Sequence, residues 1–138
     1  MNLNKLQIKT ENKKYPIFIG NNLLNKLKVI LQRNFINFNQ CLVIVDKNVP
    51  KKLVNNVLSY LPKKKISLHY FNSSEKNKNQ KTINNILSIL LSKNFNRNDC
   101  LISIGGGITG DTSGFSASIF KRGLKFVNIP TTLLSQFL

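Results

Sequence analysis

The stretch that decides the fold is Leu101-Ile-Ser-Ile-Gly-Gly-Gly-Ile-Thr-Gly-Asp111. It begins as a short apolar run, as expected of a strand that is buried on both faces of a sheet. Gly105, Gly107 and Gly110 then follow the spacing G-x-G-x-x-G, directly after this strand and at the start of a helical pattern. Glycines let a backbone approach a phosphate closely, and the first N–H groups of the following helix point at phosphate oxygens. The stretch therefore predicts a phosphate-binding turn, with a tightly packed strand-to-helix turn as the alternative.

The glycine turn departs from the usual dinucleotide-binding fingerprint in one respect. That fingerprint places an acidic residue about 20 positions further on, at the end of the next strand, where it binds ribose hydroxyls. The next strand here ends in Asn128-Ile-Pro-Thr-Thr132, which contains no acid. The acid that follows a strand is Asp46, upstream of the glycines. This difference argues against the ordinary dehydrogenase Rossmann fold, and any ribose contact is expected from another strand.

The remainder of the chain alternates strand-like and helix-like segments. Polar and apolar residues alternate on either side of a turn-like segment at 11–14, which predicts a β-hairpin. The predicted strands of the sheet cover residues 41–45, 66–71, 100–104 and 125–129, and the predicted helices cover 23–31, 54–61, 83–91 and 108–120. Such alternation with short connections is typical of right-handed βαβ units. We therefore predict an α/β fold, a Rossmann-like open parallel sheet preceded by a β-hairpin.

Length and composition fit a single domain. The chain has 138 residues, of which 41% are hydrophobic, enough for one buried core. No apolar run approaches the roughly 18 residues that a membrane helix needs, and residues 1–10 do not resemble a secretory signal. We therefore expect a cytoplasmic protein with no membrane partner.

The net charge of +16, from 21 basic and 5 acidic residues, raises the question of a nucleic-acid partner. The lysines are scattered, and only Lys63-Lys64-Lys65 forms a tight run. Proteins that bind nucleic acids usually combine arginines with aromatic residues on one face. Because asparagine and isoleucine are abundant as well, the lysine excess indicates A/T-rich codons, and no nucleic-acid partner is expected.

Metal-ligating side chains are scarce. Cys41 and Cys100 lie 59 positions apart, each at the start of an apolar run, and are expected to be buried core residues. The only histidine is His69. One histidine and two separated cysteines do not make a zinc site.

A longer pattern extends from Gly105 to Gln136, reading GGGITGDTSGFSASIFKRGLKFVNIPTTLLSQ. Upstream of it, Val45-Asp-Lys-Asn48 and Ser73-Ser-Glu-Lys-Asn-Lys78 occur in the matching order. In these features the chain resembles the 3-dehydroquinate synthase family. The resemblance covers essentially the whole chain and is strongest in its last third.

This resemblance implies a carbon–oxygen lyase of the shikimate pathway, in aromatic amino acid and chorismate biosynthesis. The family converts 3-deoxy-D-arabino-heptulosonate 7-phosphate to 3-dehydroquinate and phosphate. It uses NAD transiently, to oxidise a ring hydroxyl before phosphate is eliminated and to reduce the ketone afterwards. Zinc or cobalt polarises the oxygen on the oxidised carbon. A sugar-phosphate substrate and a homodimer are implied for the full-length family.

The resemblance also implies which residues bind the cofactor. Asp46 would accept hydrogen bonds from the adenosine ribose beside Asn48, and Glu75 and Lys78 would flank its ribose and phosphate region. The other expected NAD contacts are Ser73, Ser74, Lys76, Asn77, Gly106, Gly107, Ile108, Thr109, Gly110, Asp111, Thr131 and Thr132, with Asp111 near the nicotinamide. Arg122 would reach the substrate phosphate in a neighbouring subunit.

Structural interpretations of the same residues stay open. Asp46 and Asn48 suit a cap of the helix near Pro50, and Asp111 suits the start of a helix. Thr131 and Thr132 suit another cap, the segment from Glu75 to Lys78 suits a solvated turn, and Arg122 suits a surface charge. The family prefers Asp-Gly before the glutamate at 75, where this chain has Ser73-Ser74.

The family pattern requires more than this sequence contains. After Gln136 the family continues with Val-Asp and a substrate loop rich in glycine and lysine, whereas Phe137-Leu138 follow here. The family's helical second domain supplies a glutamate and two histidines as metal ligands, and these are absent. We expect residues 1–138 to form a single truncated NAD-binding domain, without a metal site or catalytic activity. A frameshift or premature stop is our hypothesis for the difference.

Two other functions stay open. One is a truncated sugar-cyclising synthase or polyol dehydrogenase of the same superfamily. The other is a small basic binding module without catalysis. Asp111 directly after Gly110, together with the run from Arg122 to Gln136, favours the 3-dehydroquinate synthase family over the first of these, and a filter-binding assay with duplex DNA would test the second.

Overall fold

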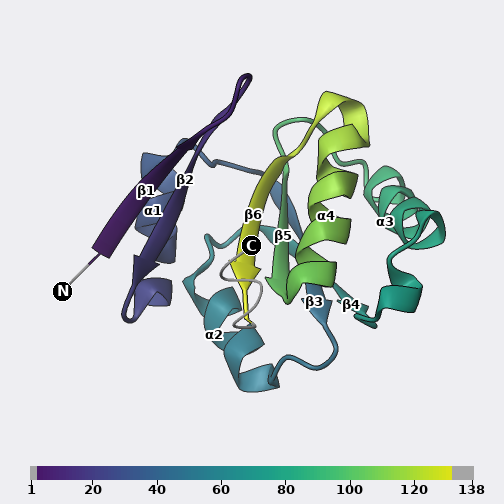
Figure 1. Ribbon diagram of the computed structural model, residues 1–138, viewed down its shortest axis with the longest axis horizontal. Coiled ribbons are helices and arrows are strands. Elements are labelled where there is room, and N and C mark those ends of the chain that lie inside the picture. The colour runs from purple at the N-terminus through teal and green to yellow at the C-terminus, as the bar shows by residue number, and fades with distance from the viewer. Residues whose placement is uncertain (1–2, 132–138) are drawn as a thin grey trace.

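The centre of the protein is a four-stranded parallel sheet. A computed structural model describes residues 3–131, and the sheet within them has the strand order β4-β3-β5-β6 (Figure 1). Its strands are β3 (Gln40–Asp46), β4 (Lys65–Phe71), β5 (Cys100–Gly105) and β6 (Lys125–Pro130). All neighbouring strands pair in parallel, which confirms the predicted open parallel sheet.

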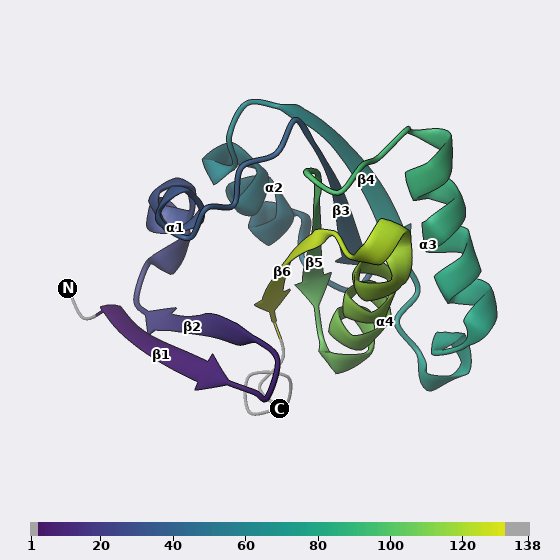
Figure 2. The ribbon, with the colours of Figure 1, turned by 90° about the horizontal axis from the view of Figure 1, so that it is seen from above.

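Helices cover both faces of this sheet. Figure 2 shows α1 and α2 on one side of the sheet and α3 and α4 on the other. The helices are η1 (Leu23–Lys26), α1 (Leu27–Arg33), α2 (Lys51–Tyr60), η2 (Glu75–Asn77), α3 (Gln80–Ser92), α4 (Gly107–Ile119) and η3 (Phe120–Arg122). The described residues contain no helix that is long and apolar enough to cross a membrane.

The continuous apolar run of β3 divides its side chains between two cores. Cys41, Val43 and Val45 belong to the core under α1 and α2, whereas Leu42 and Ile44 belong to the core under α3 and α4. All five are nearly or fully buried. This confirms the prediction that the run is a strand covered on both faces, since alternate residues of a strand point to opposite faces.

The two cysteines are fully buried partners on neighbouring strands, as predicted for core residues. Cys41 on β3 lies opposite Cys100 on β5. A hydrogen bond with Cys100, together with burial, holds the pKa of the Cys41 thiol far above its ordinary value. Because the thiolate is the reactive form, this thiol is inert at physiological pH.

The predicted β-hairpin forms a sheet of its own. Strand β1 (Leu3–Lys9) pairs antiparallel with β2 (Lys14–Gly20), and neither is hydrogen-bonded to the parallel sheet. One face of the hairpin exposes apolar side chains, among them Leu6 and Ile17, which lie opposite each other.

The strand order places a topological switch point, which we call the crevice, between β3 and β5. The chain passes from β3 to β4 on one side and then returns to form β5 on the other side of β3. The connections after β3 and β5 therefore leave the sheet in opposite directions. In open α/β sheets, ligands bind outside the carboxyl ends of the strands at such a point.

At this crevice, the backbone of β5 is packed too tightly to admit a side chain. A Cβ at position 105 would lie 2.8 Å from Cβ and Oγ1 of Thr109 and 2.9 Å from Cβ of Asp46. At position 107, two residues later, a Cβ would meet no atom of residues 3–131 within 4 Å. Gly105 is therefore required by packing, whereas no described residue fills the space above Gly107.

We predict that Gly105→Ala destabilises the protein by about 1–3 kcal/mol, because the added methyl group overpacks the contact between β5, Asp46 and Thr109. Gly107→Ala is the matched control and should keep the free energy of unfolding within about 0.5 kcal/mol. Urea unfolding of the two variants measures the difference. Equal losses of stability would show that packing at Gly105 is not the constraint.

The only histidine makes stability depend on pH in a predictable direction. Burial, followed by the nearby charge of Lys47, lowers the pKa of His69 below its ordinary 6.5. The unfolded chain therefore binds this proton more strongly than the folded chain. We predict that the free energy of unfolding is level above about pH 7 and falls as the pH decreases through 6.5 towards the lowered pKa.

His69→Gln should reduce the change of the free energy of unfolding with pH between about pH 7 and 5, where few other groups titrate. Urea unfolding at pH 7.5, 6.5 and 5.5 is the measurement, with the same buffer ions throughout. A wild-type slope that persists unchanged in the variant would contradict the assignment to His69.

Candidate functional site

Asp46 is the last residue of β3 and lies at the crevice. Its side chain is almost buried, and its Oδ1 accepts a hydrogen bond from the backbone N–H of Asn48 at 2.9 Å. The N-cap residue of α2 is Pro50, with no side-chain hydrogen bond, so the interpretation of Asp46 and Asn48 as a helix cap is wrong. No described residue donates a hydrogen bond to Oδ2 of Asp46, which leaves one carboxylate oxygen available to a ligand.

The glycine turn follows the neighbouring strand and begins α4. The backbone N–H of Gly110 donates to the carbonyl oxygen of Gly106 at 3.0 Å, which closes the first turn of the helix. No side chain caps this end of α4. The N–H groups of Gly107, Ile108 and Thr109 therefore have no partner within the helix, and they form the kind of end that binds a phosphate.

Thr131 joins this edge from β6. Its backbone N–H donates to the carbonyl oxygen of Gly105 at 2.8 Å, so it lies directly beside the glycine turn. Thr132, the other threonine expected to contact the cofactor, lies outside the described residues.

The segment 73–78 approaches the glycine turn from the far side of β3. Ser73 and Ser74 are half-buried, η2 follows, and Nζ of Lys78 reaches Oδ2 of Asp111 at 3.1 Å. The hydrogen bond with Asp111, together with its charge, raises the pKa of Lys78. Both side chains are well exposed, so the pair is screened by solvent and adds little stability. The contact shows that this segment lies next to the second turn of α4.

This ion pair revises two structural interpretations. Asp111 lies in the second turn of α4 and pairs with Lys78 rather than capping the helix. The segment 75–78 is tied to α4 rather than being only a solvated turn. Sequence reasoning assigned both residues to the cofactor but missed their contact with each other, since nothing in the local pattern connects positions 33 residues apart.

A layer of hydroxyl groups lies beneath the glycine turn, between α4 and the sheet, and sequence reasoning missed it. The buried Oγ atoms of Thr109, Thr112 and Ser113 have no hydrogen-bond partner among the described residues. Ser103 of β5 donates to Oδ1 of Asn128 on β6 at 2.7 Å. The available signal was the run of serines and threonines on the inner side of the predicted helix.

Arg122 lies away from this site. It is the last residue of η3, which follows the end of α4 and precedes β6, at the amino-terminal edge of the strands. It lines a shallow hollow there with Lys13, Arg97 and Lys125. The site at the crevice therefore does not include Arg122, and its expected role in a neighbouring subunit stays a prediction.

The remaining residues expected to contact the cofactor occupy supporting positions. Asn77 donates from Nδ2 to the carbonyl oxygen of Asn72 at 2.9 Å, which holds the turn at η2. Glu75 and Lys76 are exposed beside it. Within residues 3–131, no three His, Cys, Asp or Glu side chains are grouped to hold a metal ion.

The arrangement provides an acceptor for hydroxyl groups and a set of donors for a phosphate, on either side of one crevice. Asp46 supplies the free carboxylate oxygen, and the uncapped end of α4 supplies the N–H groups. Among the described residues, no atom lies within 4 Å of a Cβ built at Gly107, between these two groups. These features fit a dinucleotide, whose ribose hydroxyls donate and whose pyrophosphate accepts.

Comparison with known proteins identifies relatives along almost the whole chain. The protein named 3-dehydroquinate synthase from Pelagibacter ubique is 66% identical over 136 residues, which is 99% of this chain and 37% of that protein. The one from Buchnera aphidicola is 37% identical, over 95% of this chain and 36% of the relative. The chain thus spans a little over a third of the length of these curated relatives.

A solved structure has the same fold. The crystal structure of 2-deoxy-scyllo-inosose synthase complexed with carbaglucose-6-phosphate, NAD+ and Co2+ superimposes with a TM-score of 0.86 at 26% identity, covering 96% of this chain and 36% of that one. The family model described as 3-dehydroquinate synthase N-terminal matches residues 68–137, just over half of the sequence. The chain therefore belongs to the 3-dehydroquinate synthase family.

Proposed function

We propose that residues 1–138 form one domain that supplies the NAD-binding half of a 3-dehydroquinate synthase site. The observation that carries this proposal is the meeting of Asp46 with the uncapped start of α4 across the crevice between β3 and β5. Family membership and the 66% identity to the Pelagibacter protein support it. The NAD+ in the 2-deoxy-scyllo-inosose synthase structure supports the choice of cofactor.

In this proposal, each part of the crevice binds one part of the dinucleotide. The free oxygen of Asp46 accepts hydrogen bonds from the adenosine ribose. The N–H groups at the start of α4 donate to the pyrophosphate, with Gly107 leaving room for its approach. The ion pair of Lys78 with Asp111 limits the repulsion that an unpaired carboxylate would exert on the pyrophosphate.

When bound, NAD supplies a hydride acceptor for the substrate hydroxyl and a donor for the resulting ketone. The substrate proposed from the relatives is 3-deoxy-D-arabino-heptulosonate 7-phosphate, with zinc or cobalt held by parts of the family pattern that these residues lack. A homodimer and a cytoplasmic location also remain predictions. A sugar-cyclising activity is less favoured, because 2-deoxy-scyllo-inosose synthase is only 26% identical.

We predict that Asp46→Ala weakens NAD binding by about 1–3 kcal/mol, since hydrogen bonds to a charged group are worth that much. Asp46→Asn removes the charge but keeps an oxygen that can accept the hydrogen bond from the N–H of Asn48. This variant therefore distinguishes the effect of the lost charge from the effect of a disrupted turn. Isothermal titration with NAD is the measurement. Glu11→Ala, in the hairpin turn, is the matched control for removing one carboxylate and should leave affinity unchanged. Equal affinities of wild type and Asp46→Ala would remove Asp46 from the site.

We further propose that these 138 residues do not catalyse the family reaction by themselves. The support is that they carry a single histidine and correspond to 37% of the length of the Pelagibacter relative. The expected result is no phosphate release from the proposed substrate with NAD and zinc or cobalt present, because the cation's electrostatic stabilisation is worth many powers of ten. Turnover that copurifies with the protein, from a host without its own 3-dehydroquinate synthase, would overturn this proposal.

A further inference from the structure

The acidic residues are distributed unevenly between the two edges of the sheet. Of the five in the sequence, Asp46, Glu75 and Asp111 lie at the carboxyl edge with the proposed NAD site. Asp99 lies at the amino edge, but it is fully buried and accepts hydrogen bonds from the backbone N–H groups of Gln40 and Asn96. The fifth, Glu11, is in the hairpin turn. The solvent-facing amino edge therefore has many lysines and little to balance them.

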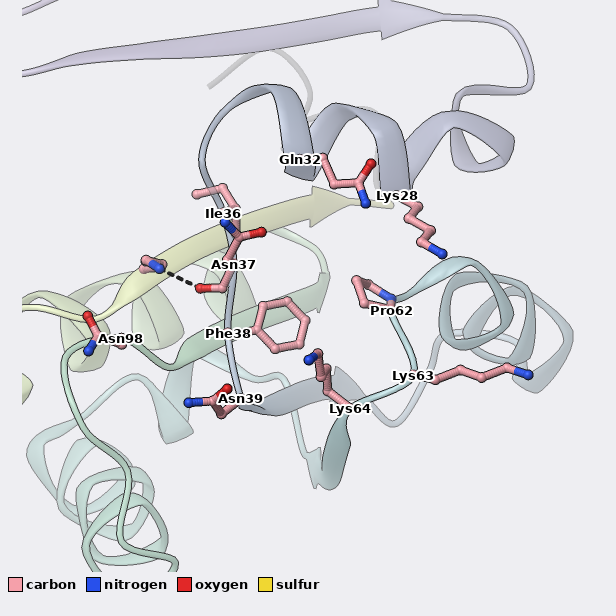
Figure 3. Close-up of a pocket in the computed structure, with 11 residues that line it drawn as sticks. Lys28, Gln32, Ile36, Asn37, Phe38, Asn39, Pro62, Lys63, Lys64 and Asn98 are labelled. Carbon is pink, nitrogen blue, oxygen red and sulfur yellow. Dashed lines mark hydrogen bonds between the residues drawn. The ribbon is translucent and has the colours of Figure 1, made fainter.

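A hollow of about 600 Å³ lies at this edge, bounded by α1, the turn after α2 and the start of β6. Its four basic residues are Lys28, Lys63, Lys64 and Lys125. Figure 3 shows the end of Lys64 beside Phe38, the side chain of Lys28 extending from α1 past Pro62, and the end of Lys63 directed away from the hollow. None of the five acidic residues lines the hollow.

The remaining walls combine amide groups with an apolar floor. Asn37, Asn39 and Asn98 provide amides, and Phe38 and Ile36 provide the apolar surface. Nζ of Lys125 donates to the backbone carbonyl of Asn37, which fixes β6 against the segment before β3. The hollow therefore has cationic and neutral hydrogen-bond donors around a surface that suits an organic group.

Helix dipoles account for only part of this group of lysines. A lysine is favourable in the last turn of a helix and unfavourable in the first turn. Lys28 lies inside the continuous helical stretch that η1 and α1 form, so neither helix end determines its position. Lys63 and Lys64 follow the carboxyl end of α2, where a positive charge is favourable, whereas Lys28 and Lys125 have no such explanation. Mutual repulsion in an acid-free hollow is a further cost that a bound anion would remove.

We propose that this hollow is a second anion site, which binds a small organic molecule carrying two or more phosphate groups. Lysine binds phosphate as a point charge. Several ammonium groups from separate segments are therefore better matched by a ligand with several phosphates than by a ligand with one carboxylate. A volume of about 600 Å³ is in the usual range for small-molecule sites. The site is at the opposite edge of the sheet from the glycine turn and does not depend on the proposed NAD site.

The test is a titration of isotopically labelled protein with inorganic pyrophosphate and tripolyphosphate, observed by NMR. We expect saturable shifts of the side-chain amide signals of Asn37, Asn39 and Asn98, stronger for tripolyphosphate than for orthophosphate. Pyrophosphate bound at the proposed NAD site is distinguished by the backbone amide signals of Gly106 and Gly107. Shifts confined to those two glycines would overturn the second site.

Paired lysine variants test whether the hollow or the overall charge is responsible. The double variant Lys28→Gln, Lys64→Gln should weaken tripolyphosphate binding at the asparagine signals by at least about tenfold. The control double variant Lys51→Gln, Lys52→Gln removes the same charge from exposed positions at the start of α2. It should change the affinity for tripolyphosphate less than about twofold. Spectra of the free variants verify folding. Equal weakening by both pairs, or the same signals shifting only with a single-stranded oligonucleotide, would overturn the proposal.

Discussion

The close approach of β5 to β3 at Gly105 is the contact on which the rest of the site depends. Gly105 brings its backbone against the side chains of Asp46 and Thr109, which no residue with a Cβ could do without displacement. Asp46 therefore ends β3 directly beside the start of α4. The same contact fixes where the free carboxylate oxygen and the free N–H groups face each other, so packing and proposed binding share one cause.

The parallel topology also separates two kinds of surface. Helices that return across a parallel sheet place their amino ends at the carboxyl edge of the strands and their carboxyl ends at the opposite edge. The proposed NAD site uses the first edge, where unpaired N–H groups and three acidic residues lie. The second edge collects lysines from segments distant in sequence, among them Lys28 and Lys125. A charge excess that is diffuse in sequence thus becomes concentrated in space.

The local sequence pattern was sufficient to predict the helices and strands. It also predicted the part of the site that lies at the ends of β3 and β5. The apolar runs of β3 and β5 predicted buried strands, and the glycines predicted the turn, because both depend on residues adjacent in sequence. The pair of Lys78 with Asp111 and the separation of the hairpin from the sheet were not predictable in this way. Each depends on how segments distant in sequence pack together, and the hydrophobic periodicity of a sequence does not indicate such contacts.

The layer of hydroxyl groups beneath α4 affects how stability varies with temperature. Unfolding raises the heat capacity when apolar area is exposed and lowers it when polar area is exposed. The α1 and α2 side of the sheet buries aliphatic side chains such as Val54 and Val57, whereas α4 buries Thr112, Ser113 and Ser116. The α4 layer therefore contributes less to the curvature of the stability profile, and its packing loses less of its strength on cooling than the aliphatic layer opposite.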